Sequence, residues 1–299
     1  MREAGSFAPM RDIETPMRAA VEVADRSGIR TDRREVIQAA NTLVVRLTED
    51  LVARVLIDQD GHRQGGEWFQ REIAVARHLA EQGAPVIPVH SGIDPGPHEH
   101  LGHTMNFWKF VQVIDSEPDP LDVGRTLAEC HRHLAEHDFG LPKLAILHET
   151  LSMVERHERD GVMTEEDLKL LRHHLNASIQ RLNDAPMQAL HGDAHFGNLM
   201  VTRDGLLWTD WEDAFLGPVE WDLASILWNS RHLDEDHALA DQITRGYQTV
   251  GGTVDPEVLE TCYTARAAVM SAWYPVLYPG ADGERARKLR FRMDWLASR

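Results

Sequence analysis

The sequence is poor in cysteine and has no long apolar run. Its 299 residues contain two cysteines, Cys130 and Cys262, too few for a disulfide scaffold or a cysteine-based zinc site. We expect both thiols to be buried and reduced. No apolar run approaches the roughly 18–20 residues that span a bilayer, and Met1–Gly5 lack the apolar stretch of a signal peptide. These absences exclude a membrane partner and favour a cytoplasmic protein.

Basic side chains are also scarce. The chain has 31 Lys and Arg against 48 Asp and Glu, which gives a formal net charge of −17. A chain this acidic repels the phosphates of nucleic acids, so nucleic acid is not an expected partner. The same field attracts cations and metal-bound nucleotides.

Three common enzyme signatures are missing from the sequence. It contains no Gly-x-x-x-x-Gly-Lys-Ser/Thr, no Gly-x-Gly-x-x-Gly and no Gly-x-Ser-x-Gly. These absences remove the support for a Walker-type site, a Rossmann site and an α/β-hydrolase. A histidine group in the Pro-containing loop Ile93–Gly102 suggests zinc, but in a chain with 17 histidines we interpret it as fortuitous. The group is His98, His100 and His103.

The first third of the chain is rich in short, β-branched runs. Asn41–Leu47 and Leu51–Ile57 flank a short polar turn, which predicts an antiparallel hairpin. After a Gly-rich loop over Asp58–Gly66, the spacing of apolar residues predicts a helix over Glu67–Gln82. Further strands are predicted at Pro85–Gly92 and Met105–Val113, and a short helix near Met17–Ala24.

From Leu121 onward the pattern is helical almost to the end. The face formed by Leu168, Leu171, Leu175, Ile179 and Leu182 is typical of a buried helix stripe. A second predicted helix carries His131, which we interpret as lying on a solvated face. A strand-rich third followed by a helix-rich remainder predicts an α+β protein of two lobes. The lobes are residues 1–108 and 109–299.

One segment carries recognisable chemistry. The apolar runs Leu199–Val201 and Leu206–Trp208 flank a turn-like sequence and predict a β-hairpin. Such a hairpin brings Asn198, just before it, close to Asp210, just after it. An amide oxygen and a carboxylate are ligands suited to Mg²⁺. Asp193 precedes them in a loop flanked by glycine, a suitable place for a catalytic carboxylate.

This spaced set is typical of kinase-like phosphotransferases, in which one Asp accepts the hydroxyl proton and an Asn and a second Asp hold magnesium. The stretch His191-Gly192-Asp193-Ala194-His195-Phe196-Gly197-Asn198, followed by Asp210-Trp211-Glu212, resembles the aminoglycoside phosphotransferases and their choline-kinase and homoserine-kinase relatives. The resemblance implies a two-lobed protein-kinase-like fold, with a nucleotide-binding first lobe and a second lobe for catalysis and the acceptor. Its implied cofactors are ATP and Mg²⁺.

The resemblance also implies roles for individual residues. Asp193 is the expected base, and His195 is expected near the metal and the phosphates. Asn198 and Asp210 are the implied magnesium ligands. Asp222 resembles the aspartate that braces the catalytic loop through its backbone amides.

The first lobe is expected to supply the remaining nucleotide contacts. The strand that carries a lysine in kinases has Arg54 here, and the helix that follows offers Glu72 as its partner. Phe107, Trp108 and Phe110 fall where the interlobe hinge is expected, where backbone groups would bind adenine. The turn between the first two strands contains no glycine, so the phosphate-covering loop is poorly specified.

The acceptor has to be inferred from charge. From Asp193 to Asp222 the chain has seven acids and one base, Arg203, which favours a cationic acceptor. Glu212 and Asp213 are expected nearest to it. One of four nearby tryptophans is a candidate for an ammonium contact: Trp208, Trp211, Trp221 and Trp228.

We therefore expect a small-molecule O-phosphotransferase that acts on a cationic acceptor, such as an aminoglycoside-like molecule or an amino alcohol. A kinase of a sugar or a homoserine-like amino acid is one alternative. A non-catalytic nucleotide-binding module is the other. Arg54 supports the module, and the complete set of Asp193, Asn198 and Asp210 argues against it.

Overall fold

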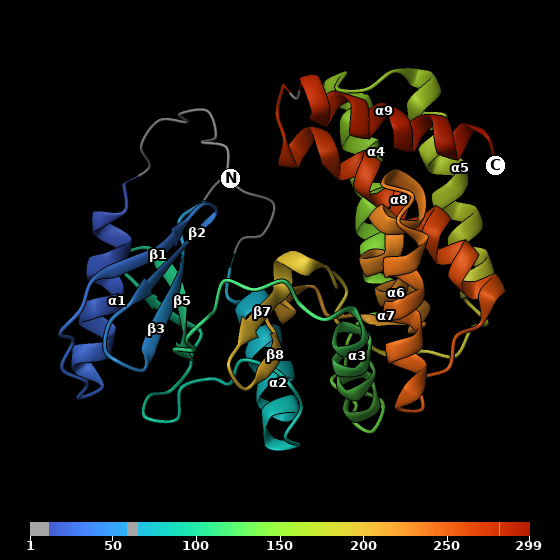
Figure 1. Cartoon of the computed structure of the whole chain (residues 1–299). Helices are drawn as coiled ribbons and strands as arrows, with labels where there is room; N and C mark the ends of the chain where they lie inside the picture. The colour runs from blue at the N-terminus through green and yellow to red at the C-terminus, as the bar shows by residue number, and fades with distance from the viewer. Residues whose placement is uncertain (1–11, 59–64, 281) are drawn as a thin grey trace.

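The computed structural model describes residues 12–58, 65–280 and 282–299. The predictions for Met1–Gly5 and for most of the loop Asp58–Gly66 lie outside these residues. The described chain forms an N-terminal antiparallel sheet beside a larger helical part (Figure 1). This two-lobed α+β architecture confirms the predicted fold class.

The N-terminal lobe is built on a five-stranded sheet in the order β1-β2-β3-β5-β4. In β2, Leu43 and Val45 are buried and alternate with partly exposed neighbours, as expected for a strand with one face in a core. The strands are β1 (Glu35–Ala39), β2 (Thr42–Arg46), β3 (Leu51–Leu56), β4 (His98–His100) and β5 (His103–Lys109).

Two helices flank this sheet, and they belong to different cores. Helix α1 (Glu14–Arg26) packs its buried alanines and valines against one face, together with Val55 and Phe107. Helix α2 (Glu67–Glu81) contributes instead to the large core that continues into the helical lobe, where Trp108 joins it. Helix α2 therefore joins the N-terminal lobe to the core of the helical lobe, whereas α1 packs on the sheet alone.

The helical lobe contains seven α-helices among the described residues. Asp119, Thr164 and Asp255 cap α3, α5 and α8 with their side chains. The helices are α3 (Pro120–Leu134), α4 (Ala145–Asp160), α5 (Glu165–Leu182), α6 (Glu220–Trp228), α7 (His237–Thr249), α8 (Pro256–Leu277) and α9 (Gly283–Ala297).

Helices α3 and α7 cross at two glycines. A Cβ atom on Gly124 would lie 2.0 Å from the carbonyl oxygen of Ile243, and one on Gly246 would lie 2.1 Å from the carbonyl oxygen of Leu121. Both distances are far below contact, so only glycine allows the two backbones to approach this closely.

Short elements carry the loops between the lobes. The predicted hairpin is present as β7 (Leu199–Thr202) and β8 (Gly205–Trp208), with Leu199 opposite Trp208. Strand β6 (Gln188–Ala189) precedes this hairpin in the sequence and β9 (Leu216–Gly217) follows it, and the two strands pair with each other. Three further helical turns complete the order: η1 (Phe196–Asn198), η2 (Trp211–Asp213) and η3 (Asn229–Leu233).

Several predicted elements are confirmed, and others are wrong. The hairpin over Asn41–Leu47 and Leu51–Ile57 and the helix over Glu67–Gln82 are present as β2, β3 and α2. The strand predicted at Pro85–Gly92 is wrong, because this segment forms only isolated bridges at Val86 and Val89. Its two prolines lack the N–H groups that a ladder needs.

One strand boundary and two further strands also differ from the prediction. The strand predicted over Met105–Val113 ends at Lys109, next to the boundary expected between residues 108 and 109. The predicted loop Ile93–Gly102 contains β4, and β1 was not expected.

Among the described residues, no helix has both the length and the apolarity to cross a membrane.

Candidate active site

The stretch His191–Asn198 forms a tight loop between β6 and β7. Gly192 has a φ of +88°, and a Cβ atom there would lie 2.1 Å from the carbonyl oxygen of Asp213. Glycine is therefore required at this position for conformation and for space. The close contact joins the catalytic loop to the turn that follows β8.

Asp222 lies under this loop and is fully buried. Its two carboxylate oxygens accept hydrogen bonds from the backbone amides of His191 (2.8 Å) and Gly192 (2.9 Å). The Trp221 indole donates to the Gly192 carbonyl oxygen at 2.7 Å. Two neighbouring residues at the start of α6 therefore hold the loop, in the geometry expected of a brace.

His131 belongs to the same buried network. It was predicted on a solvated face, but only 3% of it is exposed. Its Nε2 lies 2.9 Å from Asp222, and its Nδ1 lies 2.9 Å from the hydroxyl of Tyr247. The interpretation as a solvated residue is wrong because α3 turns this side chain toward α6 and α7.

Asp193 is held between two basic side chains. Arg266 on α8 pairs with its Oδ1, and the Nε2 of His195 lies 3.2 Å from its Oδ2. Burial alone would raise the pKa of Asp193, but the charge of Arg266 and the contact with His195 outweigh it and hold the pKa well below its usual range. Asp193 is therefore an ionised carboxylate.

The surrounding hydrogen bonds assign the tautomer of His195. The backbone amide of Gly197 donates to Nδ1 of His195 at 2.9 Å, so that nitrogen is an acceptor and Nε2 carries the proton. His195 therefore donates to Asp193. Asn198 donates its amide N–H to the Asp193 carbonyl oxygen at 3.0 Å, and its predicted role as a metal ligand would use the amide oxygen instead.

Asp210 has features suited to a cation. It adopts a left-handed conformation with φ +69°, which is uncommon for a residue other than glycine. Its Oδ1 is buried and accepts no hydrogen bond within the described structure, although it lies 3.1 Å from Nη2 of Arg54. Such a carboxylate oxygen fits a magnesium ion, and the amide oxygen of Asn198 is a second ligand of the kind that this ion prefers.

Arg54 is the centre of a second cluster. Its guanidinium lies 2.8 Å from Glu72, 2.7 Å from Glu212 and 3.1 Å from Asp210. Burial would lower the pKa of Arg54, but the charges of Glu72, Asp210 and Glu212 raise it well above its usual value.

Glu72 is the most deeply buried of the three carboxylates. Its burial raises the pKa of this carboxyl above the ordinary value, against the opposing charge of Arg54. Asn106 donates to the same carboxylate at 2.9 Å and accepts from the Trp108 indole at 2.8 Å. The partner predicted for Arg54 is therefore in contact with it and is fixed by two residues of β5.

Glu212 lies on the Arg54 side of the site. Its carboxylate pairs with Arg54, and its carbonyl oxygen accepts from Arg71 at 3.2 Å. The contact between Asp213 and the catalytic loop is made by its backbone. The structure thus brings Glu212 to the predicted nucleotide side, and its role in acceptor binding stays a prediction.

The predicted hinge residues differ in their surroundings. Phe107 is fully buried in the core that contains α1, whereas Phe110 packs against Arg46 with 3.6 Å between the guanidinium carbon and the ring centre. A cavity of about 460 Å³ lies beside Phe110. Its lining is Val86, Pro88, Lys109, Phe110, Val111, Gln112, Thr202, Arg203, Asp204 and Leu207. Adenine binding at this segment stays a prediction.

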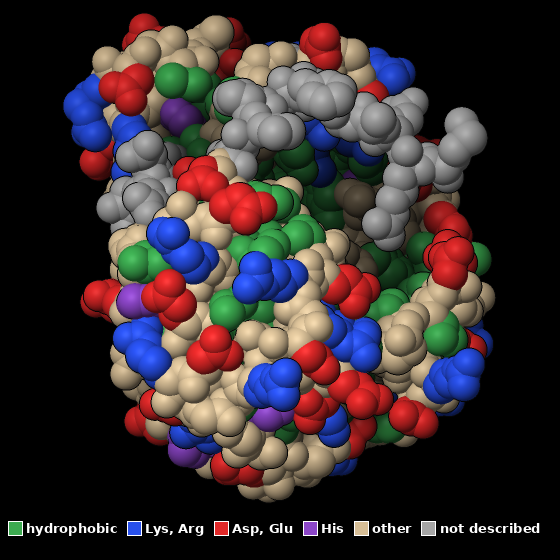
Figure 2. All heavy atoms as spheres, turned by 90° about the vertical axis from the view of Figure 1, so that its left-hand side faces the viewer, with side chains coloured by type: hydrophobic (Ala, Val, Ile, Leu, Met, Phe, Trp, Pro, Cys, Tyr) green, Lys and Arg blue, Asp and Glu red, His purple; other side chains and the backbone are tan. Residues whose placement is uncertain are grey.

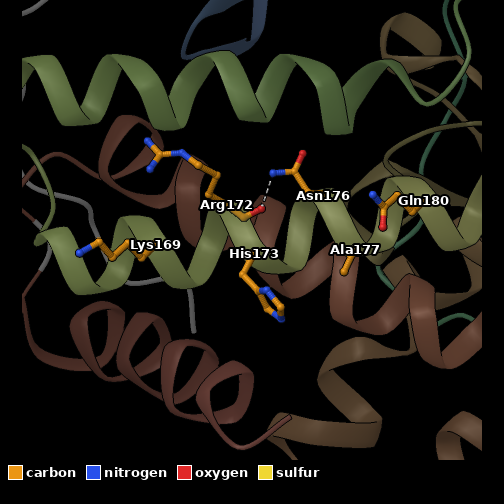
Figure 3. Close-up of a pocket in the computed structure, with 6 residues that line it drawn as sticks. All are labelled: Lys169, Arg172, His173, Asn176, Ala177 and Gln180. Carbon is orange, nitrogen blue, oxygen red and sulfur yellow. Dashed lines mark hydrogen bonds between the residues drawn. The ribbon is translucent and has the colours of Figure 1, made fainter.

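A second hollow, of about 400 Å³, lies on α5 and contains none of the predicted site residues (Figure 3). Its lining is Lys169, Arg172, His173, Asn176, Ala177 and Gln180. The face of the molecule that carries the N-terminal sheet shows acidic and basic side chains interspersed (Figure 2). Its charge therefore does not mark a separate site.

The four tryptophans and three histidines singled out in the sequence pack or form hydrogen bonds within the fold. Trp208, Trp211, Trp221 and Trp228 are each at most 3% exposed, so they belong to the core. His98, His100 and His103 contact three different partners, which are the Asp94 carbonyl, the Glu22 carboxylate and the Leu56 carbonyl.

Sequence reasoning missed Arg266 and Asn106. Arg266 carries a signal, because it is the only charged residue between Thr261 and Leu277 in an otherwise uncharged part of α8. A lone charge in such a stretch indicates a buried ionic contact. Asn106 offers no such signal, since an amide within a strand is unremarkable until its neighbours are known.

This fold and this arrangement of carboxylates define the class of protein-kinase-like phosphotransferases. A sequence model described as the phosphotransferase enzyme family matches residues 24–260, and the chain belongs to that family. A sequence comparison with curated proteins gives no match.

Solved structures of similar fold cover most of this chain. An amicoumacin kinase bound to AMP-PNP and Ca²⁺ has a TM-score of 0.70 at 12% identity, over 89% of each chain. A microcompartment-associated aminopropanol kinase has a TM-score of 0.68 at 16% identity, over 93% of this chain and 95% of that one. A choline/ethanolamine kinase family protein from Mesorhizobium loti has a TM-score of 0.61 at 15% identity, over 90% and 88%.

Proposed function

We propose that this protein transfers the γ-phosphoryl group of ATP to a hydroxyl group of a small molecule. The observation that carries the proposal is a chain of contacts: Asn198 donates to the Asp193 carbonyl oxygen, and the backbone amide of Thr209, next to Asp210, donates to the Asn198 carbonyl oxygen at 3.1 Å. Arg54 lies beside Asp210. The nucleotides in related structures, such as AMP-PNP and ADP, support ATP as the donor.

The Arg54 cluster is proposed to bind the nucleotide phosphates. Arg54 offers a planar fork of donors that suits phosphate oxygens. Glu72 holds this fork at 2.8 Å and is itself held by Asn106. The guanidinium is thereby oriented before a ligand arrives.

Asp210 and Asn198 are the proposed magnesium ligands. When bound, magnesium neutralises charge that develops on the transferred phosphoryl group. The buried Oδ1 of Asp210 and the amide oxygen of Asn198 supply the hard oxygens that this ion prefers. Arg54 lies 3.1 Å from the same Oδ1, so an incoming cation would share or replace that contact.

Asp193 is the proposed base. As the acceptor oxygen attacks the γ-phosphorus, its proton moves to a carboxylate oxygen of Asp193, and the bond to the β-phosphate oxygen breaks to release ADP. His195 donates to Oδ2 and orients the carboxylate. Asp222 keeps the loop in place through the amides of His191 and Gly192.

The acceptor is proposed to carry an ammonium group. The acidic stretch Asp193–Asp222 favours cations, and related structures include kinases of amino alcohols by name. A neutral metabolite is the alternative within the same reaction. A non-catalytic binding module is the alternative outside it, and the paired and oriented Asp193 argues against that module.

A screen for ADP release tests the reaction. The purified full chain is incubated with ATP, Mg²⁺ and a panel of amino alcohols, aminated sugars, matched neutral sugars and hydroxylated amino acids. We expect acceptor-dependent release of ADP that disappears when magnesium is chelated. Binding of ATP without release for any acceptor would support the non-catalytic module.

A further inference from the structure

The cavity of about 460 Å³ lies on the side of β5 that faces away from β3. Lys109, the last residue of β5, pairs on one side with Leu51 of β3. On the other side its backbone amide donates to the Pro88 carbonyl oxygen at 3.0 Å. Pro88 lines the cavity, whereas no residue of β3, which the structure describes in full, does so. Strand β5 therefore separates the cavity from the strand that carries Arg54.

The same cavity lies at the turn of the β7–β8 hairpin. Thr202, Arg203 and Asp204 of this turn line it. Asn198 and Asp210, the proposed magnesium ligands, flank the opposite end of the hairpin. The four-residue strands separate the two ends by roughly 10 Å, at about 3.3 Å per residue. A ligand in the cavity would therefore leave the proposed metal site open.

The lining of the cavity combines an apolar wall with two unpaired cations. Within the described part of the chain, neither the Lys109 ammonium nor the Arg203 guanidinium has an ion pair or a side-chain hydrogen bond. Asp204 is the one carboxylate among the described lining residues. The lining thus carries two cations and one anion, in a chain whose net charge is −17. The apolar members are Val86, Pro88, Phe110, Val111 and Leu207.

We propose that this cavity is an effector site for a small molecule with an apolar body and one anionic group, either a carboxylate or a phosphate. Its volume lies in the range of about 300–1,000 Å³ that is usual for small-molecule sites. The planar fork of Arg203 suits either anion, and the ammonium of Lys109 adds a second group of donors. The apolar wall covers the body of the ligand.

The site lies beside the connection between the two lobes. After Lys109 the chain leaves β5, and the backbone amide of Ile114 donates to the Val201 carbonyl oxygen of β7 at 2.9 Å. Val113 forms a bridge with Thr202. A ligand that contacts both this connection and the hairpin turn fixes their relative position. We therefore expect its binding to change the affinity for nucleotide, and the nucleotide to change the affinity for the ligand by the same factor.

Matched probes test the site with a binding readout that does not depend on turnover. Isothermal titration calorimetry of the full chain measures 4-phenylbutyrate and phenyl phosphate, the neutral 4-phenylbutyramide, and inorganic phosphate, which has no apolar body. Each titration is repeated with saturating Mg²⁺ and AMP-PNP. We expect the dissociation constants of the two amphipathic anions to be about tenfold lower than those of the amide and of inorganic phosphate. AMP-PNP should leave this binding in place and shift its dissociation constant by about fivefold.

Variants at the hairpin turn assign the binding to this cavity. Arg203→Gln should raise the Kd of both anions about tenfold, the lower range for hydrogen bonds to charged groups, and Lys109→Gln should act in the same direction. Arg203→Lys keeps the charge and should restore part of the affinity. Asp204→Asn removes the carboxylate of the lining and should strengthen the binding of anions. Arg203 is an exposed turn residue, so its replacement should leave the fold intact. Arg287→Gln removes an exposed arginine of α9 and should bind the probes normally.

The outcomes separate the effector site from the phosphotransferase. The effector site is overturned by binding that AMP-PNP abolishes, by binding that Arg203→Gln leaves unchanged, by equal binding of the anions and the amide, or by no binding of either anion. A dissociation constant that AMP-PNP does not shift overturns the coupling to the nucleotide. If AMP-PNP itself does not bind, the proposed function fails, and the comparison with Arg203→Gln still decides whether the cavity is a site.

Discussion

Two buried arginines of the site, Arg54 and Arg266, have different surroundings. Arg54 is one cation among three carboxylates, Glu72, Asp210 and Glu212. Asp193 is one carboxylate beside two bases, Arg266 and His195. The first cluster has more carboxylates than cations, whereas in the second one carboxylate is paired with one guanidinium and accepts a hydrogen bond from an imidazole.

The difference in charge suits the two clusters to different roles. The Arg54 cluster is completed by a cation, which fits a metal ion brought in with nucleotide phosphates. In the Asp193 cluster the carboxylate is already paired with Arg266 and contacted by His195, which fits a group that is held in place for proton transfer. The net charge of −17 does not show this difference, because it describes the whole chain and not the two clusters.

The largest effect is expected from the centre of the Asp193 cluster. Asp193→Asn should lower kcat by about 10²- to 10⁴-fold, because it removes the base. Binding of ATP should remain close to that of the unmodified protein, since the Arg54 cluster is untouched. Single-turnover kinetics and nucleotide titration measure the two quantities. Near-normal turnover would remove Asp193 from the mechanism.

The metal side is tested at Asp210. Asp210→Asn should lower kcat/KM by about 100-fold at fixed Mg²⁺, because a bound metal stabilises the reacting phosphoryl group by several kcal/mol. The magnesium concentration needed for half-maximal rate should rise. A titration with Mg²⁺ at constant ATP measures it, and an unchanged magnesium dependence would contradict this assignment.

Arg54 is expected to matter for the nucleotide and not for the acceptor. Arg54→Ala should raise the KM for ATP by about 10- to 100-fold, the value of lost charge-assisted hydrogen bonds. It should also lower turnover, while the KM of the acceptor changes little. Arg54→Lys keeps the cation and serves as the matched variant. Normal ATP kinetics for Arg54→Ala would show that the first lobe has been aligned wrongly.

Arg266 tests the pH dependence of the second cluster. Burial raises the pKa of Asp193, and Arg266 is the largest of the contacts that together lower it, so the loss of Arg266 should raise that pKa. A base is active when ionised, so activity falls as pH drops through the pKa. Arg266→Gln should therefore lose activity at a higher pH than the unmodified protein. The pH profile of kcat/KM measures the shift, and an unmoved acidic limb would contradict the ion pair.

The smallest effect is expected at Glu212. Its carboxylate contacts Arg54, so Glu212→Gln should raise the KM for ATP by about two- to fivefold, as for a modest ion pair. Asp213→Asn is the matched neighbour, and the charge pattern of the sequence predicts an acceptor role for both. Acceptor KM values for the two variants decide between these assignments, since a rise in acceptor KM alone would place Glu212 on the acceptor side.

The parts of the site that could be predicted from the sequence are those carried by motifs with fixed spacing. The hairpin that separates Asn198 from Asp210 was predictable because turn residues flanked by apolar runs are a local signal. Glu72 was predictable because a helix follows the Arg54 strand. The strand predicted at Pro85–Gly92 was wrong, since an apolar run with two prolines cannot form a ladder.

Long-range partners could not be predicted from the sequence. Arg266 lies 73 positions after Asp193, and His131 lies 91 positions before Asp222. Each contact depends on how α8 or α3 is rotated about its axis, which a periodic pattern does not specify for polar side chains. Asn106 became meaningful only once β5 was seen to lie beside α2.

The position of the catalytic loop depends on a helix crossing that lies away from any substrate, the crossing of α3 and α7. The backbones meet at Gly124 and Gly246 with no room for one methyl group. Beyond that contact the same two helices carry His131 and Tyr247, which support Asp222 from below. The crossing thus works as the foundation of the catalytic loop. A residue larger than glycine at this crossing would push α3 and α7 apart. His131 and Tyr247 would move with these helices, so the catalytic loop would lose its alignment.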